Sequence, residues 1–100
     1  MPLIYHVTTG SLWDNAQQQG FYEAPSLKEE GFIHCSEEHQ VKGVLERYYQ
    51  GQQNLVKLVI DTDKLKSDFI FEWSPSTKDT FPHIYGAVNL DAIVEVQSIT

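Results

Sequence analysis

Short stretches in which apolar and polar residues alternate predict most of the β-strands of this chain. In the stretch 3–8, Leu3, Tyr5 and Val7 alternate with positions that include His6. Because successive side chains of a strand point to opposite faces, we expect one apolar face here, with His6 on the opposite, polar face. The same reasoning predicts strands at 31–36, 55–60, 69–73, 81–86 and 93–99. The stretch 55–60 is apolar on both faces apart from Lys57, which predicts a central strand.

Capping residues predict the first helical segments. Ser11 is a good N-cap with Asp14 at the capping-box position, and Gly20 is a suitable stop, so a short helix is expected over 12–19. Ser26 repeats the start signal and predicts one more helical turn.

Ser36 is expected to cap the longest helix of the chain. The apolar stripe of this helix follows the spacing i, i+3, i+4, i+7 and consists of Val41, Val44, Leu45 and Tyr48. The turn-rich segment 74–79 is expected to be an exposed, mobile loop. Strands followed and interrupted by short helices predict an α+β fold.

Length and charge limit the possible functions. With 100 residues and 41% hydrophobic residues, the chain is expected to form a single domain over 1–100. A net charge of -7 disfavours duplex nucleic acid and anionic membranes as partners. We see no export signal or membrane span, and the lone Cys35 suits a reducing compartment, so we expect a cytoplasmic protein.

Three histidines occupy similar positions on short predicted strands. His6, His34 and His83 each lie on a polar or mixed face, and Tyr85 shares the face of His83. Taken singly, each histidine can be read as structural. Taken together, they predict a polar cleft, whereas His39 is interpreted as a solvent-facing residue of the long helix.

Other kinds of chemistry fit these residues less well. Cys35 shares its strand face with Ile33, and its neighbour His34 points the other way, so we interpret Cys35 as a small buried residue rather than a nucleophile. Three imidazoles could bind zinc, but no short His-to-His spacing specifies such a site, and we predict no metal ligand. Glycine-rich phosphate loops are absent from the sequence.

Several motifs together resemble the family known as domain of unknown function 952. They are Ile4-Tyr5-His6-Val7-Thr8, Trp13, Gly20, Glu30-Gly31-Phe32-Ile33-His34-Cys35-Ser36, Gln40-Val41 and Phe81-Pro82-His83-Ile84-Tyr85-Gly86. The resemblance covers nearly the whole chain, and the chain is identified as a member of this family.

The first half of the chain also resembles the ADP-ribosyltransferase fold, and most closely its RNA 2'-phosphotransferase branch. This resemblance implies a small mixed or antiparallel sheet that binds NAD or a related nucleotide. By motif position, His6 would contact a ribose of NAD with Thr8 beside it, and His34 would support the substrate. We assign His34 and His83 as the candidate catalytic residues. The candidate cofactor-binding residues are His6, Thr8, Ser36 and Tyr85, the last as an aromatic wall.

The sequence also departs from these enzymes. Its single arginine, Arg47, falls in the long helix away from the motifs, so no arginine is expected to hold phosphate near the histidines. Glu72 and Glu95 match the expected catalytic glutamate by position only. From the resemblance and the three histidines, we expect an ADP-ribosyltransferase-like domain that binds NAD or a related nucleotide. The alternatives are a non-catalytic ligand-binding module of the same fold and a histidine-ligated, metal-dependent hydrolase.

Overall fold

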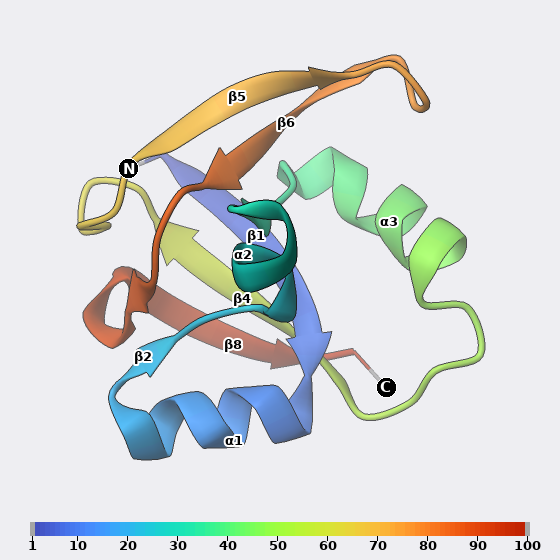
Figure 1. Cartoon of the computed structure of the whole chain (residues 1–100). Coiled ribbons are helices and arrows are strands. Elements are labelled where there is room, and N and C mark those ends of the chain that lie inside the picture. The colour runs from blue at the N-terminus through green and yellow to red at the C-terminus, as the bar shows by residue number, and fades with distance from the viewer. Residues whose placement is uncertain (1, 100) are drawn as a thin grey trace.

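The computed structural model describes residues 2–99 and has an α+β fold with antiparallel sheets, as predicted (Figure 1). In chain order its elements are β1 (Leu3–Thr9), α1 (Gly10–Gln19), β2 (Phe21–Tyr22), α2 (Pro25–Glu30), β3 (Ile33–His34), the 3-10 helix η1 (Glu38–Gln40), α3 (Val41–Tyr48), β4 (Leu55–Asp61), β5 (Phe69–Ser74), β6 (Asp79–Ile84), β7 (Val88–Asn89), the 3-10 helix η2 (Leu90–Ala92) and β8 (Ile93–Ser98). Within residues 2–99, no helix has the length and apolar character needed to span a membrane.

The first sheet has the order β1-β4-β8, and both of its pairings are antiparallel. The strand β4 lies in the middle, which confirms the central strand predicted at 55–60. Its residues Leu58 and Ile60 are fully buried. A strand with neighbours on both edges and covered faces needs apolar side chains on both faces, and this sequence supplies them.

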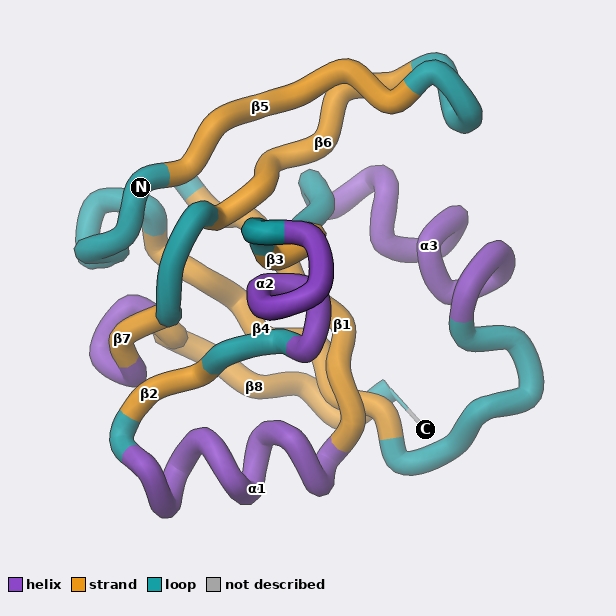
Figure 2. The backbone as a smooth tube through the Cα atoms, viewed as in Figure 1, coloured by secondary structure: helices purple, strands orange, loops and turns teal. Residues whose placement is uncertain are grey.

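A second sheet, with the order β3-β6-β5, is joined to the first through the segment that follows β3 (Figure 2). Tyr5 and Ser36 exchange two backbone hydrogen bonds, with N···O distances of 2.8 and 2.7 Å. The amide of Cys35 donates to the carbonyl of Pro82 at 3.0 Å. The segment 33–36 is therefore held between β6 and β1, which brings the predicted histidine-bearing strands together.

Both faces of β1 are buried, so the prediction of one apolar and one polar face is wrong. Ile4 packs in the main core, whereas Tyr5 and Val7 belong to a second cluster with Val41 of α3. His6 shares the face of Ile4 and is only 7% exposed. The strand pattern gave the correct alternation, but it could not reveal that a helix covers each face.

The residues predicted to cap the first two helices do not cap them, so these predictions are wrong. Thr9 precedes α1, and its hydroxyl accepts a hydrogen bond from the amide of Leu12 at 3.2 Å, which places Ser11 inside the helix. Ala24 precedes α2 without a side-chain cap, and the hydroxyl of Ser26 instead donates to a backbone carbonyl. Both helices end as predicted, at left-handed glycines: Gly20 and Gly31 (φ 95° and 93°).

The helix expected after Ser36 begins later and is not the longest. Glu37 caps η1 through a capping box with Gln40, and α3 follows with 8 residues against 10 in α1. Tyr48, predicted on the apolar stripe, is 61% exposed, and Tyr49 packs on the core in its place. The exposed Tyr48 is thereby free to line a pocket.

Candidate functional site

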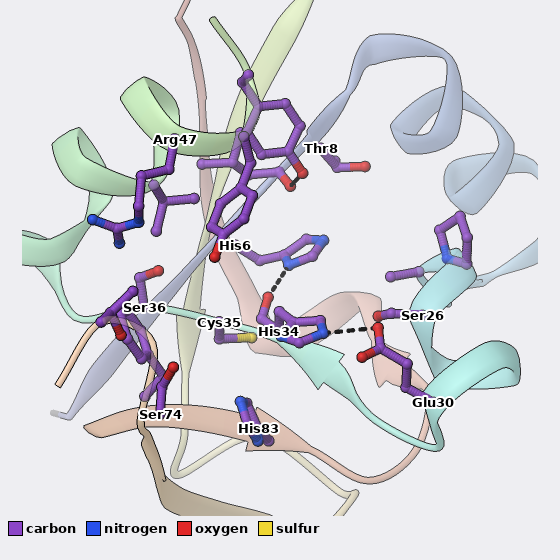
Figure 3. Close-up of a pocket in the computed structure, with 18 of the residues that line it drawn as sticks. His6, Thr8, Ser26, Glu30, His34, Cys35, Ser36, Arg47, Ser74 and His83 are labelled. Carbon is purple, nitrogen blue, oxygen red and sulfur yellow. Dashed lines mark hydrogen bonds and ion pairs between the residues drawn. The ribbon is translucent and has the colours of Figure 1, made fainter. Parts of the chain in front are cut away.

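A pocket of about 790 Å³ lies between β1, α2, α3, the segment 33–36 and the tip of the β5–β6 hairpin (Figure 3). This volume is in the range of small-molecule sites. Five of the six predicted site residues line it: His6, Thr8, His34, Ser36 and His83. Tyr85 is not among the lining residues, so its predicted role as an aromatic wall gains no support from its placement. The predicted loop 74–79 forms the hairpin tip, and part of it lines the pocket.

His6 is held at the inner end of the pocket by hydrogen bonds to both ring nitrogens. Its Nδ1 lies 2.5 Å from the carbonyl oxygen of His34, and its Nε2 lies 2.7 Å from the hydroxyl of Tyr22. A carbonyl only accepts hydrogen bonds, so Nδ1 carries the proton and Nε2 of the neutral ring accepts one from Tyr22. The Thr8 hydroxyl, 2.9 Å from that of Tyr22, completes the network.

Burial sets the charge of this network. Loss of hydration lowers the pKa of His6 from its ordinary value of 6.5 to about 4, and the same effect raises the pKa of the Tyr22 phenol. His6 is therefore neutral near pH 7. With both ring nitrogens hydrogen-bonded, His6 links β1 to the segment 33–36, and it offers no free nitrogen to a ligand unless these hydrogen bonds rearrange.

His34 forms the first of two pairs between an imidazole and a carboxylate. Its Nε2 lies 2.9 Å from the carboxylate of Glu30, and the two side chains are 54% and 51% exposed. Figure 3 shows both side chains at the same side of the pocket. Glu30 is the only Asp or Glu that lines the pocket within the described part of the chain.

His83 forms the second pair, on the strand opposite. His34 and His83 are direct partners in the β3–β6 pairing, so their side chains share one face, as strand alternation predicted. The ring centroids are 5.3 Å apart. Nδ1 of His83 lies 2.7 Å from the carboxylate of Glu72, and Phe32 stacks on the ring at 4.2 Å.

Glu72 also accepts a hydrogen bond from the hydroxyl of Tyr85. The hydrogen bonds from Tyr85 and His83 lower the pKa of the Glu72 carboxyl, so it is ionised. Glu72 thus fixes His83 from behind without lining the pocket. Glu95 lies on β8, where Gln97 donates to it, and it does not line the pocket either.

The expected isolation of Arg47 is wrong. Arg47 lines the same pocket as the three histidines, because α3 packs beside β1 and turns this residue toward the site. Its guanidinium extends over Gly43, where a Cβ atom would approach a terminal nitrogen to 3.0 Å. A sequence signal was present, since a glycine four residues before the only arginine leaves room for such a side chain on a helix.

Cys35 is buried, as predicted, and burial raises the pKa of its thiol. It is therefore unsuited to act as a nucleophile. His39 is exposed, also as predicted. Among residues 2–99, no three His, Cys, Asp or Glu side chains are grouped so that they could hold a metal ion.

Comparison with known proteins identifies the family of the chain. The family model described as "Protein of unknown function (DUF952)" matches residues 7–96. The chain belongs to this family. No curated protein matches it.

This DUF952 protein is similar to solved structures of protein CC0527 from Caulobacter crescentus. Two crystal structures, one of the protein and one of a double mutant, each have a TM-score of 0.89, at 29% and 28% sequence identity. Both alignments cover 99% of this chain and 87% of the CC0527 chain. A solution NMR structure has a TM-score of 0.83 at 30% identity and is covered over 85% of its length.

Proposed function

We propose that this DUF952 protein binds NAD or a related nucleotide in its pocket, as an ADP-ribosyltransferase-like domain. The supporting observation is the convergence of His6, Thr8, His34, Ser36 and His83, from three separate segments, on one pocket of about 790 Å³. This volume suits a ligand of nucleotide size. Cys35, unpaired and buried, fits the reducing, cytoplasmic location that we propose for the protein.

The two histidine pairs give the pocket groups suited to transfer chemistry. In the proposed reaction the bond between nicotinamide and the ribose carbon breaks, and its electron pair leaves with nicotinamide. The Glu30 carboxylate stabilises the positive charge that develops on the ribose. An acceptor hydroxyl forms the new bond to that carbon and gives its proton to His83, whose Nε2 is not used by Glu72.

Titration with NAD and with ADP-ribose, followed by NMR of the imidazole signals, tests the binding. We expect shifts at His34 and His83, which line the pocket, and none at His39, which is exposed and outside it. Unchanged signals of His34 and His83 at millimolar ligand would refute the proposal.

A matched pair of variants tests the site itself. His34→Ala removes an imidazole that lines the pocket, and we expect NAD affinity to fall about tenfold or more, as for loss of a hydrogen bond to a charged group. His39→Ala removes an exposed imidazole and should leave affinity unchanged. If the two substitutions changed NAD affinity equally, NAD would bind outside this pocket.

The second candidate is a binding module of the same fold without turnover. Two observations favour it: the ring nitrogens of His6 are both occupied, and Glu72 and Glu95 do not line the pocket. Chromatographic detection of nicotinamide released from NAD separates the two candidates. Binding without release in the presence of a range of hydroxyl acceptors supports the module, whereas release that His83→Ala abolishes supports the transferase.

A further inference from the structure

The charged groups that line the pocket are separated by sign. Arg47 is the only Lys or Arg, and Glu30 the only Asp or Glu, among the lining residues that the structure describes. Figure 3 shows Arg47 and Ser36 on one side of the pocket, and Glu30 and Ser26 on the opposite side. A ligand that fills the pocket therefore meets a cation at one end and an anion at the other.

The guanidinium of Arg47 has no carboxylate partner among the residues that the structure describes. No ion pair between Arg47 and an acidic side chain occurs within residues 2–99. Its Cζ lies 5.8 Å from the centroid of the Tyr48 ring, and its charge acts on Asp79 without forming an ion pair with it. Asp79 is already engaged, because Gln40 donates to its carboxylate at 2.9 Å. A guanidinium with five donors and no anion is suited to bind one from a ligand.

Figure 3 shows the side chains of Ser36 and Ser74 on the same side of the pocket as Arg47. The side chain of Ser36 is buried at the lining and makes no hydrogen bond with another described residue. The hydroxyl oxygen of Thr77, in the hairpin tip that lines the pocket, is buried and has no partner within residues 2–99. Buried polar atoms normally have partners, so the Thr77 hydroxyl is an unused hydrogen-bonding group in the pocket wall, and the Ser36 hydroxyl is open to a ligand.

We infer that Arg47, together with the Ser36 hydroxyl, forms a subsite for a phosphate or pyrophosphate group, and that Glu30 and His34 receive the ribose at the opposite end. This inference gives the orientation of the ligand and rests on the proposed function for its identity as a nucleotide. The anion subsite itself can be tested without NAD. Because the net charge of -7 repels phosphate overall, binding of an anion in the pocket depends on Arg47, the only Lys or Arg among its described lining residues.

Inorganic pyrophosphate is the first probe, with binding measured by NMR shifts and calorimetry. Arg47→Gln should lower its affinity about tenfold to a hundredfold, as expected for the loss of a charge-assisted hydrogen bond. Lys42→Gln removes the same charge from the same helix at an exposed position that does not line the pocket, and should have little effect. Arg47→Lys keeps the charge without the planar fork and should give an intermediate affinity.

A second set of titrations tests the orientation. Glu30→Gln should weaken NAD and adenosine 5'-diphosphoribose but leave pyrophosphate affinity unchanged or higher, because a negative charge is removed from the far end. Arg47→Gln should weaken every phosphate-bearing ligand. If Glu30→Gln and Arg47→Gln reduced pyrophosphate affinity equally, the proposed orientation would be overturned.

The outcomes separate this inference from the proposed function. If pyrophosphate binds through Arg47 and NAD does not bind, the anion subsite stands and the NAD proposal fails. If NAD binds equally well to the original protein and to a folded Arg47→Gln variant, the NAD proposal stands and the subsite is refuted. Absence of pyrophosphate binding to the original protein, or an equal loss in Lys42→Gln, also overturns the subsite.

Discussion

The buried, neutral state of His6 makes the stability of the fold depend on pH. In the unfolded chain His6 takes up a proton near its ordinary pKa of 6.5, whereas in the folded protein it does so only near pH 4. Between these values the unfolded state binds more protons, so a falling pH favours unfolding. The stability due to neutral His6 is complete above about pH 6.5 and is lost progressively toward pH 4. The loss amounts to about 3 kcal/mol, a large part of the 5 to 15 kcal/mol typical of a small domain.

Urea unfolding at several pH values between about 7 and 4, followed by circular dichroism, measures this effect. His6→Asn keeps a donor near the position of Nδ1 but cannot take up a proton, so its stability should fall about 3 kcal/mol less over this range. His39→Asn, at the exposed histidine, is the control and should behave like the original protein. Parallel pH profiles for the original protein and His6→Asn would refute the reasoning. If His6→Asn does not fold, the His6 ring signals provide the check, because they should not titrate above about pH 5.

Four further substitutions or reactions test single features of the fold. Tyr22→Phe removes the hydroxyl shared by His6 and Thr8 and should lower the free energy of unfolding by about 1 to 3 kcal/mol in urea titrations; an unchanged value would contradict the buried network. Cys35 should resist thiol reagents in the native state and react only after denaturant is added, so rapid native labelling would count against its burial. Thr77→Val removes a buried hydroxyl that has no partner within residues 2–99 and should leave stability within about 1 kcal/mol or raise it; a loss above about 2 kcal/mol would mean that the hydroxyl has a partner in solution. Gly31→Ala, at φ 93°, should cost about 1 kcal/mol in thermal or urea unfolding, and a gain in stability would argue against the left-handed helix end.

The local pattern of the sequence was sufficient for several parts of the site. Alternation predicted that His34 and His83 share a face, and their direct pairing between β3 and β6 agrees with this. Gly20 and Gly31 predicted where the first two helices end, because only glycine adopts the left-handed conformation without strain. Such features depend on neighbours in the chain, which are visible in the sequence.

The sequence was less informative where two nearby residues could fill the same structural role. Ser11 and Ser26 are good caps, but Thr9 caps one helix, and the backbone turns into the other at Ala24. Tyr48 fits an apolar stripe, yet the adjacent Tyr49 packs on the core and its hydroxyl donates to the carbonyl of Val7. Where two neighbouring residues have similar local preferences, tertiary packing decides which of them takes the role.

The sequence by itself determined the α+β class, the central strand and the set of histidine-bearing strands. Only the tertiary structure decided that His6 is sealed by Tyr22, that Glu30 pairs with His34, and that Arg47 reaches the pocket. His6 and Tyr22 lie on β1 and β2, Glu30 ends α2 and pairs with His34 on β3, and Arg47 lies on α3, so each contact joins two separate elements that meet only in the folded chain. Periodicity fixes the face on which a side chain lies, but the element that covers this face is selected by the burial of the whole core.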